Sequence, residues 1–378
     1  MKKLGYLLFA FIYYICCIFP RNQYKVFCIM THDPSDRGNV GVVVQALKKR
    51  GGYTFHELGK EERDVVTKKG KVTNLVQFFL IQPYHLATAS IVLQDNIFLP
   101  MAYMKFPKKV KVIQLWHGTG TIKRFGQSVN DGELGRLEKA ADRTITHLII
   151  NGKATKEIYQ EAFGVDEDKV YELGLPRTDL LFDKEACEDI KDDFYKRYPE
   201  LKNKQLVLYA PTFRDSEVSS PKLPFDLETL LSNLPENMTL GLKLHPFVAK
   251  SFQGIQLKDE LKGKVYDFSC EPDTNQLLLI SDLLITDYSS IIFEYCVLRK
   301  PMLFYAYDYD LFKKEQRGFY EDYETFVPGT IVYNQAELIK VLQQGEYDIS
   351  KVDDFMKRQY RYTDGKSTQR LIDQILCK

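Results

Sequence analysis

Short apolar runs alternate along this chain with longer segments in which apolar and polar residues are mixed. In the first half, the apolar runs rich in β-branched and aromatic residues are Tyr24–Met30, Tyr53–Leu58, Ala89–Leu93, Val110–Leu115 and His147–Ile150. Their length and composition predict buried strands, whereas Val42–Leu47 and Ala154–Phe163 have the spacing of helices. Repeated strand and helix units predict a parallel, doubly wound sheet, so the expected fold class is α/β.

A second series of apolar runs follows the charged, helix-prone segment Asp183–Lys204. Its predicted strands are Gln205–Tyr209, Thr239–Leu244, Lys264–Phe268, Leu283–Thr286 and Met302–Tyr305. A chain of 378 residues exceeds one ordinary hydrophobic core. We therefore expect two Rossmann-like lobes, at residues 21–182 and 183–378, with helices from residue 347 to the end.

The first 20 residues form an apolar segment of their own. Lys2 and Lys3 precede the run Leu4–Phe19, which Pro20 and Arg21 end. The run is shorter than the ~20 residues that span a bilayer and lacks a signal-peptide cleavage site, and its tyrosines and flanking lysines favour a helix on a membrane surface. We expect peripheral attachment to the cytoplasmic face of the cell membrane. A helix packed on the protein's own core and a short membrane span are the alternatives.

Polar side chains gather just after several of the predicted strands. The segments are VIQLWHGTGTIKRFG from Val112, LVLYAPTFRD from Leu206, LGLKLHP from Leu240 and SDLLITDYSSIIFEY from Ser281, joined by GLPRTD from Gly174. Ser289 and Ser290 stand where a helix should begin, at the positive end of its dipole, and this arrangement suits a phosphate or diphosphate. An ordinary helix cap is the alternative. Because loops at the carboxyl ends of parallel strands line the ligand crevice, these residues could converge on one diphosphate substrate.

The histidines and arginines of these segments suit phosphoryl chemistry. His117 is a candidate general base, because imidazole titrates near neutrality. His245 is a candidate donor to a diphosphate or a leaving phosphate, with Lys243 on the same face of its strand. Arg177 and Arg214 can each bind phosphate oxygens through two N–H groups. A purely structural role is the alternative for His117, His245 and Lys243.

Further polar residues of the same segments complete the predicted substrate-binding set. They are Thr212, Thr286, Asp287, Glu294, Lys123 and Arg124. Asp287 is expected to order its turn, and Glu294 to accept hydrogen bonds from ribose hydroxyls by analogy with other nucleotide-sugar enzymes. Lys123 and Arg124 would meet the donor or a lipid diphosphate, or else form a solvated surface pair. Asp179 and Asp215 are expected to hold the arginines in place.

Composition narrows the classes of partner. Lys plus Arg total 52 against 51 for Asp plus Glu, so the overall charge gives no footprint for nucleic acid. The seven cysteines show neither a CxxC pair nor a Cys/His metal spacing, which fits a reducing cytoplasm. No carboxylate cluster stands out as a metal site, so we expect no tightly bound cofactor, although Mg²⁺ can assist such chemistry.

The motifs WHGT, GLPRTD, YAPTFRD, LKLHP and SDLLITDYSSIIFEY occur in an order that resembles the CDP-glycerol glycerophosphotransferase family, whose members build teichoic acids and related polyol-phosphate polymers. The resemblance covers about Val110–Gly329. It implies a two-lobed fold of the GT-B type with the active site in a central cleft. It also implies that a C-terminal helix, here Ser367–Cys377, crosses back to the first lobe. The family's matching histidine makes His117 a candidate base and His245 a substrate contact.

The resemblance implies transfer of glycerol phosphate from CDP-glycerol to an undecaprenyl-diphosphate-linked acceptor in wall teichoic acid synthesis, with release of CMP. We expect a primase rather than a polymerase, because the chain leaves no room for a large extra domain, and a homo-oligomer is compatible with the sequence. The alternatives are ribitol phosphate as the transferred unit, a GT-B glycosyltransferase that uses a nucleotide-sugar, and a non-catalytic membrane-bound scaffold. The presence of both histidines, both arginines and the serine pair argues against the scaffold.

Overall fold

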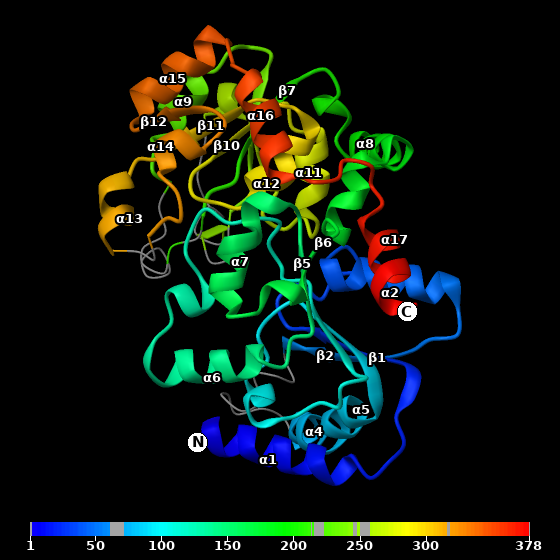
Figure 1. Cartoon of the computed structure of the whole chain (residues 1–378). Coiled ribbons are helices and arrows are strands. Elements are labelled where there is room, and N and C mark those ends of the chain that lie inside the picture. The colour runs from blue at the N-terminus through cyan, green and yellow to red at the C-terminus, as the bar shows by residue number, and fades with distance from the viewer. Residues whose placement is uncertain are drawn as a thin grey trace. The chain divides into compact units, whose positions relative to one another are not determined.

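The computed structural model (Figure 1) describes residues 2–60, 72–212, 214, 223–244, 248–249, 258–315 and 318–377. The chain divides into two compact units. The first unit comprises Met1–Thr119, Arg124–Asp179 and Gln359–Lys378, and the second comprises Gly120–Lys123 and Leu180–Arg358. Each unit is built around one parallel sheet, as the alternation of strands and helices predicts.

The first unit contains a six-stranded sheet in the order β2-β1-β3-β4-β5-β6. Its strands are β1 (Asn22–Met30), β2 (Thr54–Gly59), β3 (Ala89–Gln94), β4 (Lys111–Gln114), β5 (His147–Ile150) and β6 (Val170–Glu172). Every pairing within it is parallel. All carboxyl ends of the strands therefore lie at one edge of the sheet.

Helices cover both faces of the first sheet (Figure 1). They are α1 (Lys2–Cys16), α2 (Asn39–Arg50), α4 (Val72–Val76), α5 (Gln82–Thr88), α6 (Gly132–Asp142), α7 (Lys156–Phe163) and α17 (Ser367–Leu371), with π-helical turns η1 (Gln77–Ile81) and η11 (Ile372–Leu376). Phe27 and Ile29 of β1 pack toward α1 and α5, whereas Val26 and Cys28 pack toward α2 and the C-terminal helices. Because both faces are buried, β1 reads as a continuous apolar run.

The second unit repeats this architecture with the strand order β12-β11-β10-β7-β8-β9, again with parallel pairings. Its strands are β7 (Gln205–Tyr209), β8 (Met238–Leu242), β9 (Val265–Asp267), β10 (Leu283–Thr286), β11 (Met302–Tyr305) and β12 (Thr330–Val332). Its helices are α8 (Lys184–Arg197), α9 (Leu227–Asn233), α11 (Thr274–Ile280), α12 (Ile291–Tyr295), α13 (Tyr309–Glu315), α14 (Tyr323–Phe326), α15 (Gln335–Gln344) and α16 (Ser350–Gln359). One core lies between the sheet and the pair α9 and α15.

Short 3₁₀ turns connect these elements. They are η2 (Leu99–Tyr103), η3 (Gly126–Ser128), η4 (Lys153–Thr155), η5 (Glu167–Lys169), η6 (Pro176–Phe182), η7 (Pro199–Leu201), η9 (Asp259–Leu261) and η10 (Cys296–Leu298). Each of the predicted apolar runs contains a strand. The three-residue strands β6 and β12 were not predicted, since so short a segment shows no periodicity of its own.

The compact units differ from the expected lobes in two places. Residues 359–378 belong to the first unit, where α17 packs beside α2 and Leu371 lies in the core, so the expected range 183–378 for the second lobe is too long. The return of Ser367–Cys377 to the first lobe is therefore observed. Gly120–Lys123, expected in the first lobe, belongs to the second unit.

The N-terminal helix α1 packs on the core of the first unit, which was the alternative to a membrane-surface helix. Phe9 and Tyr13 are fully buried against Phe78, Phe98 and Phe106, so residues 1–20 are part of the first unit and not a separate segment. The opposite side of α1 is apolar and exposed. Its exposed side chains are Leu4, Leu7, Leu8, Phe11, Tyr14 and Ile15. Among the helices that the structure describes, none has both the length and the apolar character needed to cross a membrane.

Candidate active site

Each sheet has one position where its strand order reverses, and ligands of open α/β sheets bind outside the carboxyl ends of the strands there. In the first unit the reversal lies between β1 and β3, and in the second between β7 and β10. The second order is the one found in dinucleotide-binding folds. The predicted segments YAPTFRD and TDYSS follow β7 and β10, so they stand at the second reversal.

At the reversal in the first unit, Asp95 orders the turn that follows β1. Its carboxylate accepts backbone N–H bonds from Thr31 (3.0 Å), His32 (3.2 Å) and Asp33 (2.8 Å). Burial raises the pKa of Asp95 to about 6, although these three donors act in the opposite direction. Asp95 and His32 were not predicted. Their signal in the sequence is that each closely follows a strand at the reversal.

His117 lies in the loop after β4, and one hydrogen bond fixes its tautomer. The ring Nδ1 is 2.8 Å from the backbone carbonyl oxygen of Asp95. A carbonyl oxygen only accepts, so Nδ1 carries the proton and Nε2 presents a lone pair. The His117 ring also stacks on His32, with centroids 3.6 Å apart and planes at 14°. A protonated Nδ1 and a lone pair on Nε2 are the arrangement that a general base requires.

The pKa of His117 differs from the expectation of a value near neutrality. Burial, helped by the nearby positive charges of His32 and Arg177, lowers the pKa of His117 to about 3, although the hydrogen bond to Asp95 acts in the opposite direction. The imidazole is therefore neutral at physiological pH, which keeps the Nε2 lone pair available.

Arg177 and Asn39 hold the loop that carries His117. Arg177 donates from Nη1 to the carbonyl oxygen of His117 (2.8 Å), and its backbone N–H donates to the side chain of Asn39 (3.0 Å). Asn39 in turn donates to the carbonyl oxygens of Leu115 and Trp116. Trp116 has a φ of 54°, a strained conformation for a bulky residue, and these bonds stabilise it. Arg177 thus lies beside His117 as predicted, and Asn39 is an unpredicted partner.

In the second unit, Arg214 is the centre of a buried ion-pair network. Its guanidinium contacts Asp308 through Nε (2.6 Å) and Nη2 (2.9 Å), and Asp287 through Nη2 (2.8 Å). Nη1 donates to the carbonyl oxygen of Thr212 (2.9 Å), and the side chain is 7% exposed. With most of its donors engaged, Arg214 positions the two loops at the reversal. Its predicted contact with phosphate remains a prediction.

Asp287 orders its turn, as the sequence predicts. Its Oδ1 accepts from the backbone N–H groups of Thr212 (2.7 Å) and Tyr288 (2.6 Å), which ties the loop after β7 to the loop after β10. Thr286 performs a similar task, because its hydroxyl donates to the carbonyl oxygen of Ala210 (2.7 Å). Its predicted contact with substrate is thus replaced by an internal bond. Thr212 Oγ1 is buried and has no hydrogen-bond partner among the described residues.

Ser289 and Ser290 precede α12, but this helix is only five residues long. Its dipole is correspondingly small, so the serine hydroxyls and backbone N–H groups are the main features of this helix start. Ser290 is the N-cap residue, yet its side chain makes no capping hydrogen bond, while Ser289 Oγ accepts a long one from Ile291 N–H (3.4 Å). Both serines are partly exposed, so the Ser290 hydroxyl in particular is not consumed by an ordinary cap.

Three other predicted residues have internal roles in the structure. Lys243 donates to the carbonyl oxygens of Ser269 (3.2 Å) and Glu271 (2.5 Å), so it orders the segment after β9 in place of contacting phosphate. Asp179 accepts from the backbone N–H groups of Ser367 and Thr368, so the prediction that it holds Arg177 was wrong. Glu294 is buried on α12, at 4% exposure.

The segment Gly120–Lys123 packs within the second unit. Lys123 forms an isolated antiparallel bridge with Phe319, and Tyr320 N–H donates to the carbonyl oxygen of Ile122 (3.2 Å). A Cβ at Gly120 would lie 2.3 Å from the Phe293 ring, so this close approach requires glycine. The ammonium of Lys123 lies 6.0 Å from the Phe312 ring centroid. Lys123 and Arg124, which were predicted to act together, belong to different units, and Arg124 is exposed.

Two predicted residues, His245 and Asp215, lie outside the described residues. Their predicted roles therefore remain predictions from the sequence. The described loops of the second unit still bring together Thr212, Arg214, Asp287 and the serine pair at the reversal between β7 and β10.

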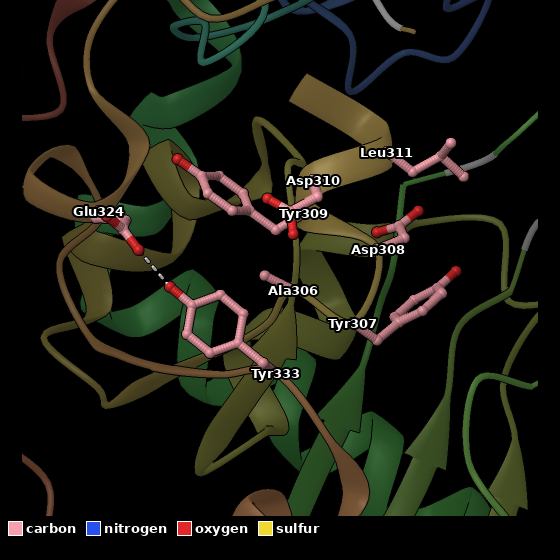
Figure 2. A pocket seen from close by; sticks show the side chains of 8 residues that line it. All are labelled: Ala306, Tyr307, Asp308, Tyr309, Asp310, Leu311, Glu324 and Tyr333. Atoms are coloured by element: carbon pink, nitrogen blue, oxygen red, sulfur yellow. Dashed lines mark hydrogen bonds between the residues drawn. The ribbon is translucent and has the colours of Figure 1, made fainter. Parts of the chain in front are cut away.

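A cavity of about 710 Å³ follows the carboxyl end of β11 (Figure 2). Its lining is formed by Ala306, Tyr307, Asp308, Tyr309, Asp310, Leu311, Glu324 and Tyr333. Figure 2 shows the hydrogen bond that the Tyr333 hydroxyl donates to Glu324 (2.5 Å). Asp308, another residue of the lining, accepts a hydrogen bond from Arg214. Tyrosine rings and carboxylates suit an uncharged group with hydroxyl or amino donors. Sequence reasoning missed this cavity, although AYDYDL directly follows a predicted strand.

Asp308 and Asp310 also have the Asp-x-Asp spacing of many cation sites, which was overlooked in the sequence. Asp308 is already bonded to Arg214 and to the Tyr288 hydroxyl (3.1 Å). Within the described part of the chain, no three His, Cys, Asp or Glu side chains are grouped as metal ligands.

Comparison with known sequences places these features in a family. The sequence profile of CDP-glycerol:poly(glycerophosphate) glycerophosphotransferases matches residues 15–377. The teichoic acid poly(ribitol-phosphate) polymerase of Bacillus spizizenii is 33% identical over 382 residues, which cover 100% of this chain and 60% of the relative. The ribitol-phosphate polymerase TarL of Staphylococcus aureus is 37% identical over 78% of this chain and 52% of its own length. The chain thus spans between half and two thirds of the length of these relatives.

A shorter relative and a solved structure agree with this placement. The teichoic acid glycerol-phosphate primase of Bacillus subtilis is 31% identical over 77% of this chain and 74% of its own length. The wall teichoic acid polymerase TagF has a TM-score of 0.76 at 24% identity, covering 94% of this chain and 89% of that one. The fold is therefore of the GT-B type, as the motifs predict. The chain belongs to the CDP-glycerol:poly(glycerophosphate) glycerophosphotransferase family.

Proposed function

We propose that this protein transfers a polyol phosphate from a CDP-activated polyol to a hydroxyl group of a lipid-linked acceptor in teichoic acid synthesis. The new bond joins the acceptor oxygen to the distal phosphorus, the bond from that phosphorus to the bridging oxygen breaks, and CMP leaves. The relatives named above are polymerases or primases of teichoic acid. One TagF structure was obtained after a soak with CDPG, which supports a CDP-linked donor.

The geometry of His117 is the observation that carries this proposal. Its Nδ1–H is held by a backbone carbonyl, so Nε2 can take the proton of the attacking hydroxyl. A positioned base of this kind contributes about 10²- to 10⁴-fold in rate. Arg177, bonded to the carbonyl oxygen of His117, keeps the loop in place while its charge attracts the anionic donor.

We assign the donor to the reversal between β7 and β10 in the second unit. The Ser289, Ser290 and Thr212 hydroxyls would donate to the diphosphate, and His245 would protonate or hold the leaving phosphate. The tyrosine and carboxylate cavity beyond β11 would take an uncharged, hydroxyl-bearing part of the donor. Since these donors can stabilise the charge of the transferred phosphoryl group, we expect no tightly bound cation. Activity after chelation, with and without added Mg²⁺, tests this expectation.

The transferred polyol has two candidates. Glycerol phosphate is expected from the motifs, whereas the relatives with 33% and 37% identity are ribitol-phosphate polymerases, which favours ribitol phosphate as a second candidate. Purified protein should be offered CDP-glycerol and CDP-ribitol separately at equal concentration, with a UDP-sugar as the third donor. Turnover of one CDP-polyol supports the proposal and identifies the unit. Turnover of the UDP-sugar alone contradicts it in favour of a glycosyltransferase.

The acceptor is proposed to be an undecaprenyl-diphosphate-linked saccharide, and a primase remains the prediction. Both primases and polymerases occur among the relatives, so the length of the product is the informative quantity. A synthetic acceptor should be extended by one unit or very few if the chain acts as a primase. A ladder of long products at low ratios of donor to acceptor would contradict that prediction.

We also propose that the exposed side of α1 attaches the protein to the cytoplasmic leaflet. Leu4 (73% exposed), Phe11 (63%) and the following Ile18 (79%) present apolar surface beside Lys2 and Lys3. Exposed apolar residues of η1 and α5, Leu80 and Tyr84 among them, extend this surface. An amphipathic helix with flanking lysines is suited to an anionic membrane surface.

A further inference from the structure

A second cavity lies in the first unit, at the amino ends of the strands. Its volume is about 890 Å³, and its lining includes the first residues of β4 and β5 and the turn between α2 and β2. His117 and Asp95 follow the carboxyl ends of strands in the same sheet. The cavity is therefore at the opposite edge of the sheet from the candidate base, and the proposed reaction does not explain it.

The charged residues that line this cavity are all positive. Arg50, Lys108, Lys109 and Lys111 line it, and its described lining contains no Asp or Glu. Only Arg50 has an acidic neighbour, Asp373, at 3.5 Å and at the surface, where such a pair is weak. Lys108 and Lys109 pair with no carboxylate in the part of the chain that the structure describes. Four cations around one hollow repel each other unless an anion joins them.

The lining is partly fixed before any ligand arrives. Lys111 donates from Nζ to the carbonyl oxygen of Ile375 (2.5 Å), which holds its charge at the wall. The rings of Tyr24 and Tyr53 meet edge to face with centroids 5.7 Å apart. Burial and the Lys111 charge lower the pKa of His147 to about 4, so this histidine is neutral at pH 7 and the four cations set the charge.

The apolar surface of α1 and α5 lies on the other face of the sheet from α2 and the C-terminal helices, whose ends line the cavity. Tyr24 lines the cavity, and the next residue, Lys25, places its ammonium 5.0 Å from the Tyr84 ring centroid on α5. Tyr84 in turn contacts Phe19, which follows α1, with ring centroids 5.4 Å apart.

We propose that this cavity is a non-catalytic binding site for a phosphate-bearing group, held by Lys108, Lys109, Arg50 and Lys111. Two sources share this chemistry, namely the headgroup of an anionic lipid and a soluble polyol phosphate chain. The inference does not depend on the proposed reaction, because its test measures binding alone.

The test compares two double variants that lose the same charge. Lys108→Ala/Lys109→Ala removes two cations of the cavity, and Lys202→Ala/Lys340→Ala removes two exposed lysines of the second unit. Each variant and the unchanged protein are titrated with a soluble glycerol phosphate oligomer, and separately with vesicles of phosphatidylcholine alone or mixed with phosphatidylglycerol. Thermal unfolding of all three proteins checks that the fold is retained.

We expect the cavity variant to bind one of the two anionic probes about ten-fold more weakly, because hydrogen bonds to charged groups are lost. The control variant should bind within two-fold of the unchanged protein. A loss with the mixed vesicles identifies a lipid headgroup, and a loss with the oligomer identifies a soluble chain. Equal affinities of the two variants for both probes, or no binding of either probe by the unchanged protein, would overturn the inference.

Discussion

His117 owes its chemistry to a backbone group and not to an acidic side chain. The carbonyl oxygen of Asp95 fixes the Nδ1–H tautomer, and the side chain of the same residue shapes the neighbouring turn through Thr31, His32 and Asp33. One residue therefore positions both the base and the loop beside it. Asp95 is a positioning residue in this arrangement, because it acts through His117.

The pH dependence of kcat/KM distinguishes the contribution of Asp95 from that of His117. Burial raises the pKa of Asp95 from 3.8 to about 6, so the folded protein binds this proton more tightly than the unfolded chain. Stability from Asp95 is therefore greatest below pH 3.8 and declines as pH rises to about 6. Its charged form orders the turn, so kcat/KM should fall as pH decreases through about 6. His117, with a pKa lowered to about 3, contributes no such step.

The variant Asp95→Asn is the matching control for this profile. Asn cannot titrate, so kcat/KM should be low and independent of pH between about 5 and 8, whereas KM for the donor should change little. If the step near pH 6 persists in Asp95→Asn, another group is responsible for it. Circular dichroism at each pH separates loss of activity from unfolding.

The serine pair gives a second prediction at the residue scale. Ser290 makes no capping hydrogen bond, so Ser289→Ala/Ser290→Ala should leave α12 intact while removing donors to the diphosphate. At about 1–2 kcal/mol for hydrogen bonds to a charged group, donor affinity should fall roughly ten-fold or more. Calorimetry with a CDP-polyol measures this change. An unchanged affinity, or a large drop in melting temperature, would mean that the serines serve only the fold.

At the scale of elements, the Arg214 network joins the loops after β7, β10 and β11. Asp308 accepts two hydrogen bonds from a guanidinium that is almost fully buried, so its removal leaves buried donors without an acceptor, although Asp287 still balances the charge of Arg214. Asp308→Ala should therefore lower the free energy of unfolding by about 1–3 kcal/mol. Denaturant unfolding of this variant beside Asp310→Ala, a substitution outside the Arg214 network, checks the assignment. Equal stabilities of the two variants would argue against the network.

Strands within an apolar run could be predicted from the sequence, and two short strands outside such runs could not. Gln205–Tyr209, Leu283–Thr286 and Met302–Tyr305 are strands with the predicted bounds, because both of their faces are buried. By contrast, β6 and β12 are three residues long and lie outside the predicted apolar runs, where no period can be recognised.

The site was predictable as a set of residues but not as a set of roles. Strand ends carry His117, Arg177 and the serine pair, and the sheet order places the serine pair at the reversal of the second sheet. The bonds that decide each role join residues far apart in sequence, such as Arg214 with Asp308 and Asp179 with Thr368. A local pattern holds no information about such pairs.

At the scale of the whole molecule, attachment to the membrane must be tested without disturbing the core. Deletion of residues 1–20 would remove Phe9 and Tyr13, which are fully buried, so exposed positions are the better choice. Leu4→Asn/Ile18→Asn should lower binding to anionic vesicles about ten-fold, because apolar contact with the bilayer is lost. Leu134→Asn/Ile349→Asn is the matched control, since both residues are exposed elsewhere. Equal binding by the two variants would place the attachment on another surface.

The central claim is that the molecule transfers a polyol phosphate with His117 as the base, and the nucleotide product tests it most directly. Chromatography of reactions with a CDP-polyol and a lipid acceptor should show CMP in equal amount to extended acceptor. His117→Asn keeps a donor to the Asp95 carbonyl but has no Nε2, so CMP release should fall by about 10²- to 10⁴-fold with the fold unchanged. Release of CDP in place of CMP, or CMP release by His117→Asn within a few-fold of the unchanged protein, would contradict the account.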